Sequence, residues 1–152
     1  MTFALLSALV TFCIVSTVTP GPNNMMLMAS GANFGYRRTV PHMLGIAIGV
    51  AVLVLGVGAG LMTLFDLVPG TYTALKIAAV AYMLWLAWKI AKAAAPEGAK
   101  VGGKPLSFLQ GAGFQWVNPK AWSMALTAIT VYAPDRTLAS VALVGAAFAL
   151  VS

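Results

Sequence analysis

Charged and metal-binding side chains are scarce in this sequence. Only 8% of its 152 residues are charged, three of them are acidic, and there is one cysteine and one histidine. A single cysteine, Cys13, excludes an internal disulfide and a thiolate metal cage. One histidine and three acids offer no catalytic constellation, so we expect neither an enzyme nor a bound cofactor. A cleaved secretion signal is not expected either, because no Lys or Arg precedes the first apolar run.

Apolar residues are abundant instead. They make up 61% of the chain, against roughly 45–50% in soluble domains, which predicts an integral membrane protein in a lipid bilayer. The net charge of +6 does not indicate a nucleic-acid partner, because most of the nine basic residues flank apolar runs. The length allows one domain, so residues 1–152 are interpreted as a single transmembrane domain.

The apolar runs predict an all-α bundle that crosses the membrane several times, since a crossing needs about 20 apolar residues. Four complete spans and one incomplete span are expected, at residues 3–32, 41–65, 72–90, 107–133 and 137–152. The last 16 residues are short for a crossing and no anchoring charge follows them, so we expect the chain to be truncated. On this division, residues 1–92 are a first three-helix repeat, 93–106 a cytoplasmic loop and 107–152 an incomplete second repeat.

Basic residues mark the loops that stay in the cytoplasm. The loops after the first and third predicted spans, with their flanks, hold Arg37, Arg38, Lys89, Lys92, Lys100 and Lys104. The loops after the second and fourth hold Asp66, Asp135 and Arg136. This bias predicts that the amino terminus lies outside the cell membrane.

Two polar, proline-containing stretches interrupt the first and fourth predicted spans. They are Thr19-Pro20-Gly21-Pro22-Asn23-Asn24 and Gln115-Trp116-Val117-Asn118-Pro119-Lys120. Pro22 precedes Arg38 by 16 residues and Pro119 precedes Arg136 by 17, so each break lies about 24 Å of helix from the next polar loop. Because the two spans run in opposite directions, the halves read as inverted repeats of a 3+3 type with broken helices 1 and 4, a design typical of secondary transporters.

The chemistry of the breaks favours an anion. A half-helix that begins at Pro22 would present free N–H groups to a carboxylate, and Thr19, Asn23 and Asn24 add hydrogen-bonding groups. Lys120 is too deep for its side chain to reach either surface easily. We therefore expect Lys120 and the first break to converge, within about 20 Å, on the carboxylate of a substrate.

Several of these residues also have structural interpretations. The first break can be a packing kink, and Lys120 can lie near an interface if its span is re-entrant. Packing or lipid-facing roles are favoured for Trp116 and Trp122 over a place in the site. An interfacial position is favoured for His42, and a core position for Cys13.

Glycines follow one face of the second predicted span. Gly45, Gly49, Gly56 and Gly60 fall within about 60° of each other around a helix. Close packing of another helix is the favoured interpretation, and a substrate against this face is the alternative. Replacing Gly49 or Gly56 is expected to disrupt folding more than replacing Gly58, which projects from the other side.

Three motifs resemble the LysE/RhtB family of amino-acid exporters. They are Thr19 to Asn24 followed by Gly35-Tyr36-Arg37, the stretch Ala81 to Ile90, and Phe114 through Asn118-Pro119-Lys120. The stretches 104–108 and 85–90 resemble the branch that exports cysteine and O-acetylserine. The resemblance implies an exporter of small amino acids or their derivatives in the bacterial cytoplasmic membrane, with a periplasmic amino terminus and proton antiport. It also implies six helices, and the absence of an acid between Gly45 and Val50 leaves the proton-carrying group unassigned.

Two other functions stay open at this point. Some relatives in this superfamily move cadmium, although one Cys and one His are a poor ligand set for a soft ion. A non-transporting membrane scaffold would need neither Lys120 nor paired breaks. The substrate-binding residues predicted for the exporter are Thr19, Pro20, Gly21, Pro22, Asn23, Asn24, Gln115, Asn118, Pro119 and Lys120, with a small amino acid and protons as partners and homo-oligomerisation open.

Overall fold

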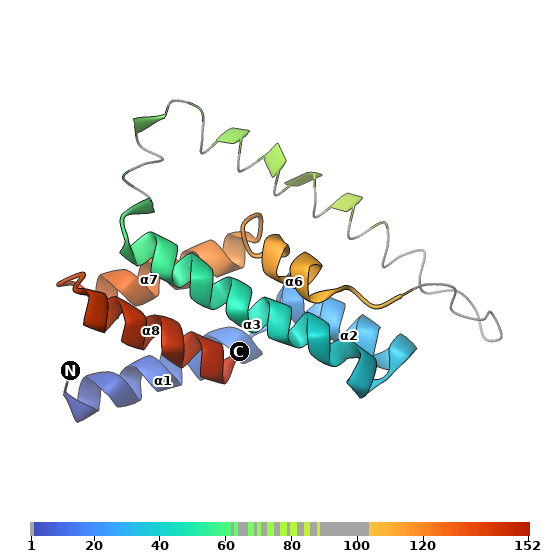
Figure 1. Ribbon diagram of the computed structural model, residues 1–152, viewed down its shortest axis with the longest axis horizontal. Helices are drawn as coiled ribbons and strands as arrows, with labels where there is room; N and C mark the ends of the chain where they lie inside the picture. Colours follow the sequence, from blue (N-terminus) through green and yellow to red (C-terminus); the bar gives the residue numbers. More distant parts are fainter. Residues whose placement is uncertain are drawn as a thin grey trace.

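The computed structural model describes residues 2–61 and 104–152, together with scattered positions between 63 and 88. Within these ranges the chain is helical and contains no strand, which confirms the all-α prediction (Figure 1). The helices are α1 (Phe3–Val18), α2 (Pro22–Phe34), α3 (Tyr36–Gly58), α6 (Phe108–Phe114), α7 (Pro119–Tyr132) and α8 (Leu138–Val151). The third predicted span and residues 93–103 of the predicted cytoplasmic loop lie outside the described residues, isolated positions apart.

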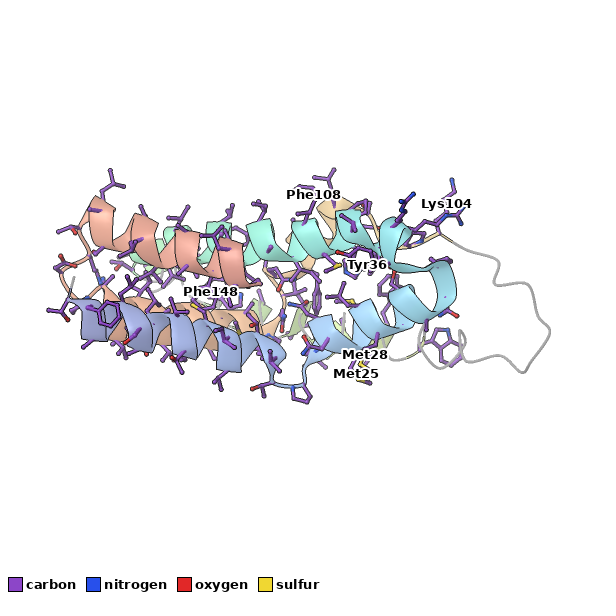
Figure 2. All side chains as sticks on the ribbon, turned by 90° about the horizontal axis from the view of Figure 1, so that it is seen from below. Met25, Met28, Tyr36, Lys104, Phe108 and Phe148 are labelled. Carbon is purple, nitrogen blue, oxygen red and sulfur yellow. The ribbon has the colours of Figure 1, made fainter. Side chains whose placement is uncertain are left out.

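Helix α3 is the centre of the arrangement. It contacts α2, α6, α7 and α8, and in Figure 1 it runs the length of the bundle with the other helices around it. Apolar side chains of α1, α3, α7 and α8 form the main core. Its fully buried members include Leu9, Cys13, Leu53, Ala125 and Phe148. Figure 2 shows Phe148 between α8 and α1, whereas Met25 and Met28 project outward from α2 and are more than half exposed.

Among the described helices, α3 alone is by itself long and apolar enough to cross a membrane. The pair α1 and α2 meets the same criteria together, with a bend of 58° at the first break. The predicted first span is therefore a broken helix in the described structure. The predicted fourth span is also broken, into α6 and α7, with residues 115–117 forming a turn between them.

The connection between the first and second predicted spans is shorter than expected. The predicted spans leave residues 33–40 as the connection between them, but α2 continues to Phe34 and α3 begins at Tyr36. Gly35 alone joins them, with a φ of 79°. Because glycine tolerates positive φ without a steric penalty, one residue reverses the chain and the helices extend into the predicted loop. Pro41 accordingly lies inside α3 and not at its start.

The structure confirms close helix packing at only some of the glycines on α3 for which it was predicted. A Cβ on Gly45 would collide with the carbonyl oxygen of Phe108, and one on Gly49 would lie 2.7 Å from the Cα of Ala112, so both pack against α6. Gly58 is just as tightly packed, because its Cβ would collide with a methyl group of Val141 on α8.

The other two members of the predicted glycine face are not tightly packed. A Cβ on Gly56 would meet only Leu61, at 3.4 Å, and one on Gly60 would meet nothing within 4 Å. Gly60 is constrained by its backbone instead, because its φ of 96° favours glycine. The expectation that Gly58 is the tolerant position was therefore wrong. The reason is that α3 is packed on two faces, by α6 and by α8, whereas the sequence pattern marked only one.

Candidate functional site

At the first break, a side chain caps the end of α1, whereas no side chain caps the start of α2. The side-chain amide of Asn24 donates to the carbonyl oxygens of Thr17, Val18 and Thr19 at 3.1, 3.1 and 3.3 Å, so it satisfies acceptors at the end of α1. Helix α2 then begins with Pro22 at its first position, and its N-cap, Gly21, offers no side-chain hydrogen bond. The N–H groups of the first turn of α2 therefore have no side-chain cap, and this end attracts negative charge.

The second break is capped by its own side chain. Asn118 Oδ1 accepts a hydrogen bond from the backbone N–H of Lys120 at 3.1 Å, and Pro119 occupies the first position of α7. Trp122 Nε1 donates to the carbonyl oxygen of Trp116 at 2.9 Å, and the two rings meet edge to face with centroids 6.3 Å apart. Neither ring lines the pocket described below. The tryptophans thus pack across the turn, in agreement with the structural interpretation.

The two breaks meet in the structure. Asn23 and Gln115 exchange two hydrogen bonds, each 3.0 Å long, between their side-chain amides. Gln115 also receives a bond from Asn118 Nδ2 at 3.2 Å and donates to the carbonyl oxygen of Gly111 at 2.9 Å. Gln115 and Asn118 are almost fully buried, so this amide network lies inside the protein. The two breaks therefore lie together, well within the roughly 20 Å that was expected.

Lys120 crosses from the second break to the first. Its ammonium group donates to the carbonyl oxygen of Thr19, and its stem lies against Gly21, where a Cβ would be 2.8 Å from Lys120 Cδ. A cation is favoured beside the carbonyl end of α1, which carries partial negative charge. A substrate carboxylate was the partner expected for the Lys120 ammonium group, but a backbone carbonyl oxygen is a partner as well. Thr19 accepts from only one of the three ammonium protons.

A pocket of about 50 Å³ opens where the breaks meet α3. Its polar lining comes from Ser16, Thr17, Asn23, Asn24, Asn118, Lys120 and Ser152, and its apolar lining includes Leu27, Ile46, Val50 and Met124. Of the ten predicted site residues, Gly21, Asn23, Asn24, Asn118 and Lys120 line it. Thr19, Pro20, Pro22, Gln115 and Pro119 lie next to the lining without forming it. Their role in binding a substrate stays a prediction.

The apolar wall was missed by the sequence argument. Ile46 and Val50 are four residues apart on α3, a helical spacing that places both on one face. That spacing is present in the sequence, but nothing local indicates which of the helical faces of α3 meets the breaks. Ser16 and Thr17, on the last turn of α1, were also missed, because they resemble the other isolated polar residues of the first predicted span.

Among the described residues that line the pocket, Lys120 has the only charged side chain. Asp135 is the only carboxylate among the described residues, and it lies in the turn between α7 and α8, where it accepts hydrogen bonds from Thr137 and Ser140. No group of three or more His, Cys, Asp or Glu side chains occurs in the part of the chain that the structure describes. The arrangement therefore suits a small anionic or zwitterionic group, with its negative charge near Lys120 and the start of α2.

His42 is not the interfacial side chain that was expected. It is fully buried on α3, and neither ring nitrogen has a hydrogen-bond partner among the described residues. The helix α6 covers it, because α6 approaches α3 closely at Gly111. This burial could not be predicted from residues near His42, because it depends on a helix some 70 positions further along the chain.

Comparison with known proteins agrees with this description. Residues 14–152 match the family model described as "LysE type translocator". The chain is 34% identical over 139 residues to the "Cysteine/O-acetylserine efflux protein" of Salmonella paratyphi A, an alignment that covers 91% of this chain and 71% of the relative. It is 32% identical over 139 residues to the protein of the same name from Escherichia coli (strain K12), with the same coverage. No solved structure matches the chain significantly.

The match begins at residue 14, so it covers all the described helices except most of α1, and it includes both breaks and the pocket. A translocator family and relatives named as efflux proteins indicate transport across a membrane and not catalysis. This chain belongs to the LysE family of membrane translocators.

Proposed function

We propose that this protein exports a small amino acid or a close derivative, and that the pocket between the breaks holds the carboxylate of the substrate. The observation that carries the proposal is the presence of two anion-attracting groups at one pocket, the ammonium of Lys120 and the uncapped start of α2. The relatives named as cysteine/O-acetylserine efflux proteins support a substrate of this class.

The rest of the pocket suits the remainder of such a molecule. Hydroxyl oxygens of Ser16 and Thr17 are available as acceptors for an α-ammonium group, although each hydroxyl donates its own proton to the carbonyl of Cys13. Ile46, Val50 and Met124 line the pocket and would contact a short side chain of the substrate. A volume of about 50 Å³ is well below the roughly 150 Å³ of a cavity that admits benzene. The pocket therefore favours small substrates and has to widen when one enters.

The proposal includes direction and energy source. Basic residues at one end of the bundle and the amino terminus at the other favour a periplasmic amino terminus in the bacterial inner membrane. Lys104 and Tyr36, the residue before Arg37 and Arg38, lie at the same end in Figure 2. Residues 1–92 and 107–152 would then belong to two oppositely oriented repeats around the pocket, and outward movement of substrate would be exchanged for inward movement of protons.

The test is counterflow of labelled cysteine and O-acetylserine in proteoliposomes that contain the full-length protein. Lys120→Met should abolish counterflow because it removes the cation that meets the carboxylate, while insertion and melting temperature are retained. Lys104→Met is the matched control, because Lys104 is exposed and outside the pocket, and it should exchange substrate normally. Cysteamine, which lacks the carboxylate, should not compete with cysteine. Normal counterflow by Lys120→Met, or full competition by cysteamine, would contradict the proposed site.

A further inference from the structure

The buried imidazole of His42 has no evident structural purpose in the described part of the chain. It is the single histidine of the sequence, and its residue is 0% exposed. Both Nδ1 and Nε2 lack hydrogen-bond partners among the described residues. A neutral imidazole carries one donor and one acceptor, and leaving buried polar groups unpaired costs free energy. An apolar side chain of similar size would avoid this cost, so the histidine must contribute in another way.

Helix α6 encloses the ring at its closest approach to α3. A Cβ on Gly111 would lie 2.8 Å from His42 Cδ2 and 2.8 Å from the carbonyl oxygen of His42. It would also lie 3.3 Å from the backbone nitrogen of Ile46. The backbones of α3 and α6 are therefore in contact here, and Gly111 permits the contact because it has no side chain.

No described group near the ring can neutralise a positive charge on it. Helices α2, α6 and α8 contain no titratable side chain. The titratable side chains of α1, α3 and α7 are Cys13, Tyr36, Arg37, Arg38, Lys120 and Tyr132, and the segment before α6 adds Lys104. None of these is a carboxylate, and Arg38, one turn before His42, is itself cationic. The packed arrangement thus accommodates the neutral imidazole and opposes the imidazolium.

Protonation of His42 therefore favours an arrangement in which α6 has moved away from α3 and water reaches the ring. The same movement alters the pocket. The carbonyl oxygen of Gly111 accepts from Gln115, which is paired with Asn23 in the pocket lining. Ile46, one turn after His42, also lines the pocket. The contact between α3 and α6 therefore adjoins both the imidazole and the pocket, so its separation would affect both, as coupling between two sites requires.

We propose that His42 is the proton-carrying group of the exchange, and that its protonation is linked to separation of α6 from α3. A proton from the periplasmic side binds the lone pair of the unprotonated ring nitrogen and gives an imidazolium. The same proton leaves to the cytoplasm when α6 closes again on α3, so one proton is carried inward per cycle and no covalent bond to substrate forms. This inference rests on the proposed export function.

The experiment separates exchange from coupling in proteoliposomes that contain the full-length protein. Counterflow of labelled substrate at equal pH on both sides reports binding and movement, and the stimulation of transport by an imposed pH gradient reports coupling. His42→Gln and His42→Met both remove the titrating group at similar volume. We expect both variants to retain counterflow, to lose the stimulation by the gradient, and to show a counterflow rate that no longer varies between pH 6 and pH 8. Thr39→Val, a buried polar change one turn earlier on α3, should keep the stimulation.

Each other outcome overturns the assignment or the function beneath it. If either His42 variant remains driven by the gradient with the pH profile of the wild type, His42 does not carry the proton. If neither variant reaches the membrane in folded form, the side chain is required for folding and the assignment is withdrawn. If the wild-type protein shows no counterflow, the proposed export function fails, and this result is distinct from a loss of coupling in the variants alone.

Discussion

Asn23 and Gln115 are 92 positions apart in the sequence and are joined by two reciprocal hydrogen bonds of 3.0 Å. Each amide donates to the other, so the start of α2 is fixed to the turn between α6 and α7. The pairing joins the two breaks directly, as does the hydrogen bond from Lys120 to Thr19. Three of the five predictions below depend on this junction or on the helix contacts that hold it.

The first prediction concerns the amide pair itself. Gln115→Leu should lower the free energy of unfolding by about 1–3 kcal/mol, because it leaves the buried amide of Asn118 and part of Asn23 unpaired. Asn23→Leu should also destabilise the protein. The double variant should be less destabilised than the sum of the two, because neither partner is left alone. Thermal or denaturant unfolding of the four proteins in detergent measures the coupling, and additive effects would show that the pair does not act as a unit.

The second prediction concerns the space that Gly21 leaves for Lys120. A Cβ on Gly21 would lie 2.8 Å from Lys120 Cδ and 3.2 Å from Nζ, so Gly21→Ala should displace the ammonium group and weaken substrate exchange. The φ of Gly21 is −169°, an extended value open to any residue, so the effect is steric and not conformational.

The matched control is Gly31→Ala in the same helix. A Cβ on Gly31 meets nothing within 4 Å, and alanine in a helix interior is more stable than glycine by roughly 0.5–1 kcal/mol. This variant should exchange substrate normally and melt slightly higher. If both alanine variants exchange substrate equally well, the space at Gly21 does not determine the position of Lys120.

The third prediction revises the expected tolerance of the glycines on α3. Gly49→Ala and Gly58→Ala should both reduce folded yield and melting temperature, because each new methyl group meets atoms of α6 or α8 below 3 Å. Gly56→Ala should be mild, since its nearest neighbour is a flexible leucine side chain at 3.4 Å. Size-exclusion profiles and melting curves of the three variants distinguish the positions. A Gly58→Ala protein as stable as the wild type would contradict the contact with Val141.

The fourth prediction concerns pH and the turn before α8. A hydrogen bond from Ser140 to Asp135, at 2.6 Å, lowers the pKa of this carboxyl below its ordinary value, with further bonds from Thr137 acting in the same direction. A group whose pKa is lower in the folded state stabilises that state above its unfolded pKa of about 3.9. The contribution is lost as the pH falls through the folded value. Ser140→Ala should therefore weaken stability at neutral pH and flatten its loss below about pH 4.

Unfolding midpoints between pH 3 and pH 7 measure this effect. Asp135 is fully exposed, so the change should be small and reduced by salt. Asp135→Asn should behave like Ser140→Ala, because it removes the carboxyl group that accepts the hydrogen bond from Ser140. Identical pH profiles for the wild type and both variants would show that the turn does not contribute.

The fifth prediction concerns orientation in the membrane. In a Cys13→Ala background, Asp135→Cys should react with an impermeant maleimide in intact cells, whereas Lys104→Cys should react only after the membrane is opened. The reason is that basic loops stay in the cytoplasm, and Lys104 belongs to the basic end of the bundle. Cys13 is fully buried and serves only as the background change. The reverse labelling pattern would invert the proposed orientation.

Much of the candidate site was predictable because its signals are local. Proline lacks a backbone donor and is favoured at the first position of a helix, and Pro22 and Pro119 each begin one. Asn118 before Pro119 is a preferred N-cap, and its side chain accepts a hydrogen bond from the backbone N–H of Lys120. Composition determined the membrane class in the same way, through the large apolar fraction. These properties depend on a residue and its immediate neighbours, so the sequence alone determined them.

Other features depend on which surfaces meet, and only the tertiary structure decided them. The pairing of Asn23 with Gln115, the use of Asn24 to cap α1 and the burial of His42 under α6 all require partners from other helices. Gly58 was misjudged for the same reason, since a one-faced pattern cannot reveal that α8 packs on the opposite side of α3. Amides, hydroxyls and glycines are compatible with many neighbours, and their roles are fixed only when packing brings distant backbone and side-chain groups within bonding distance.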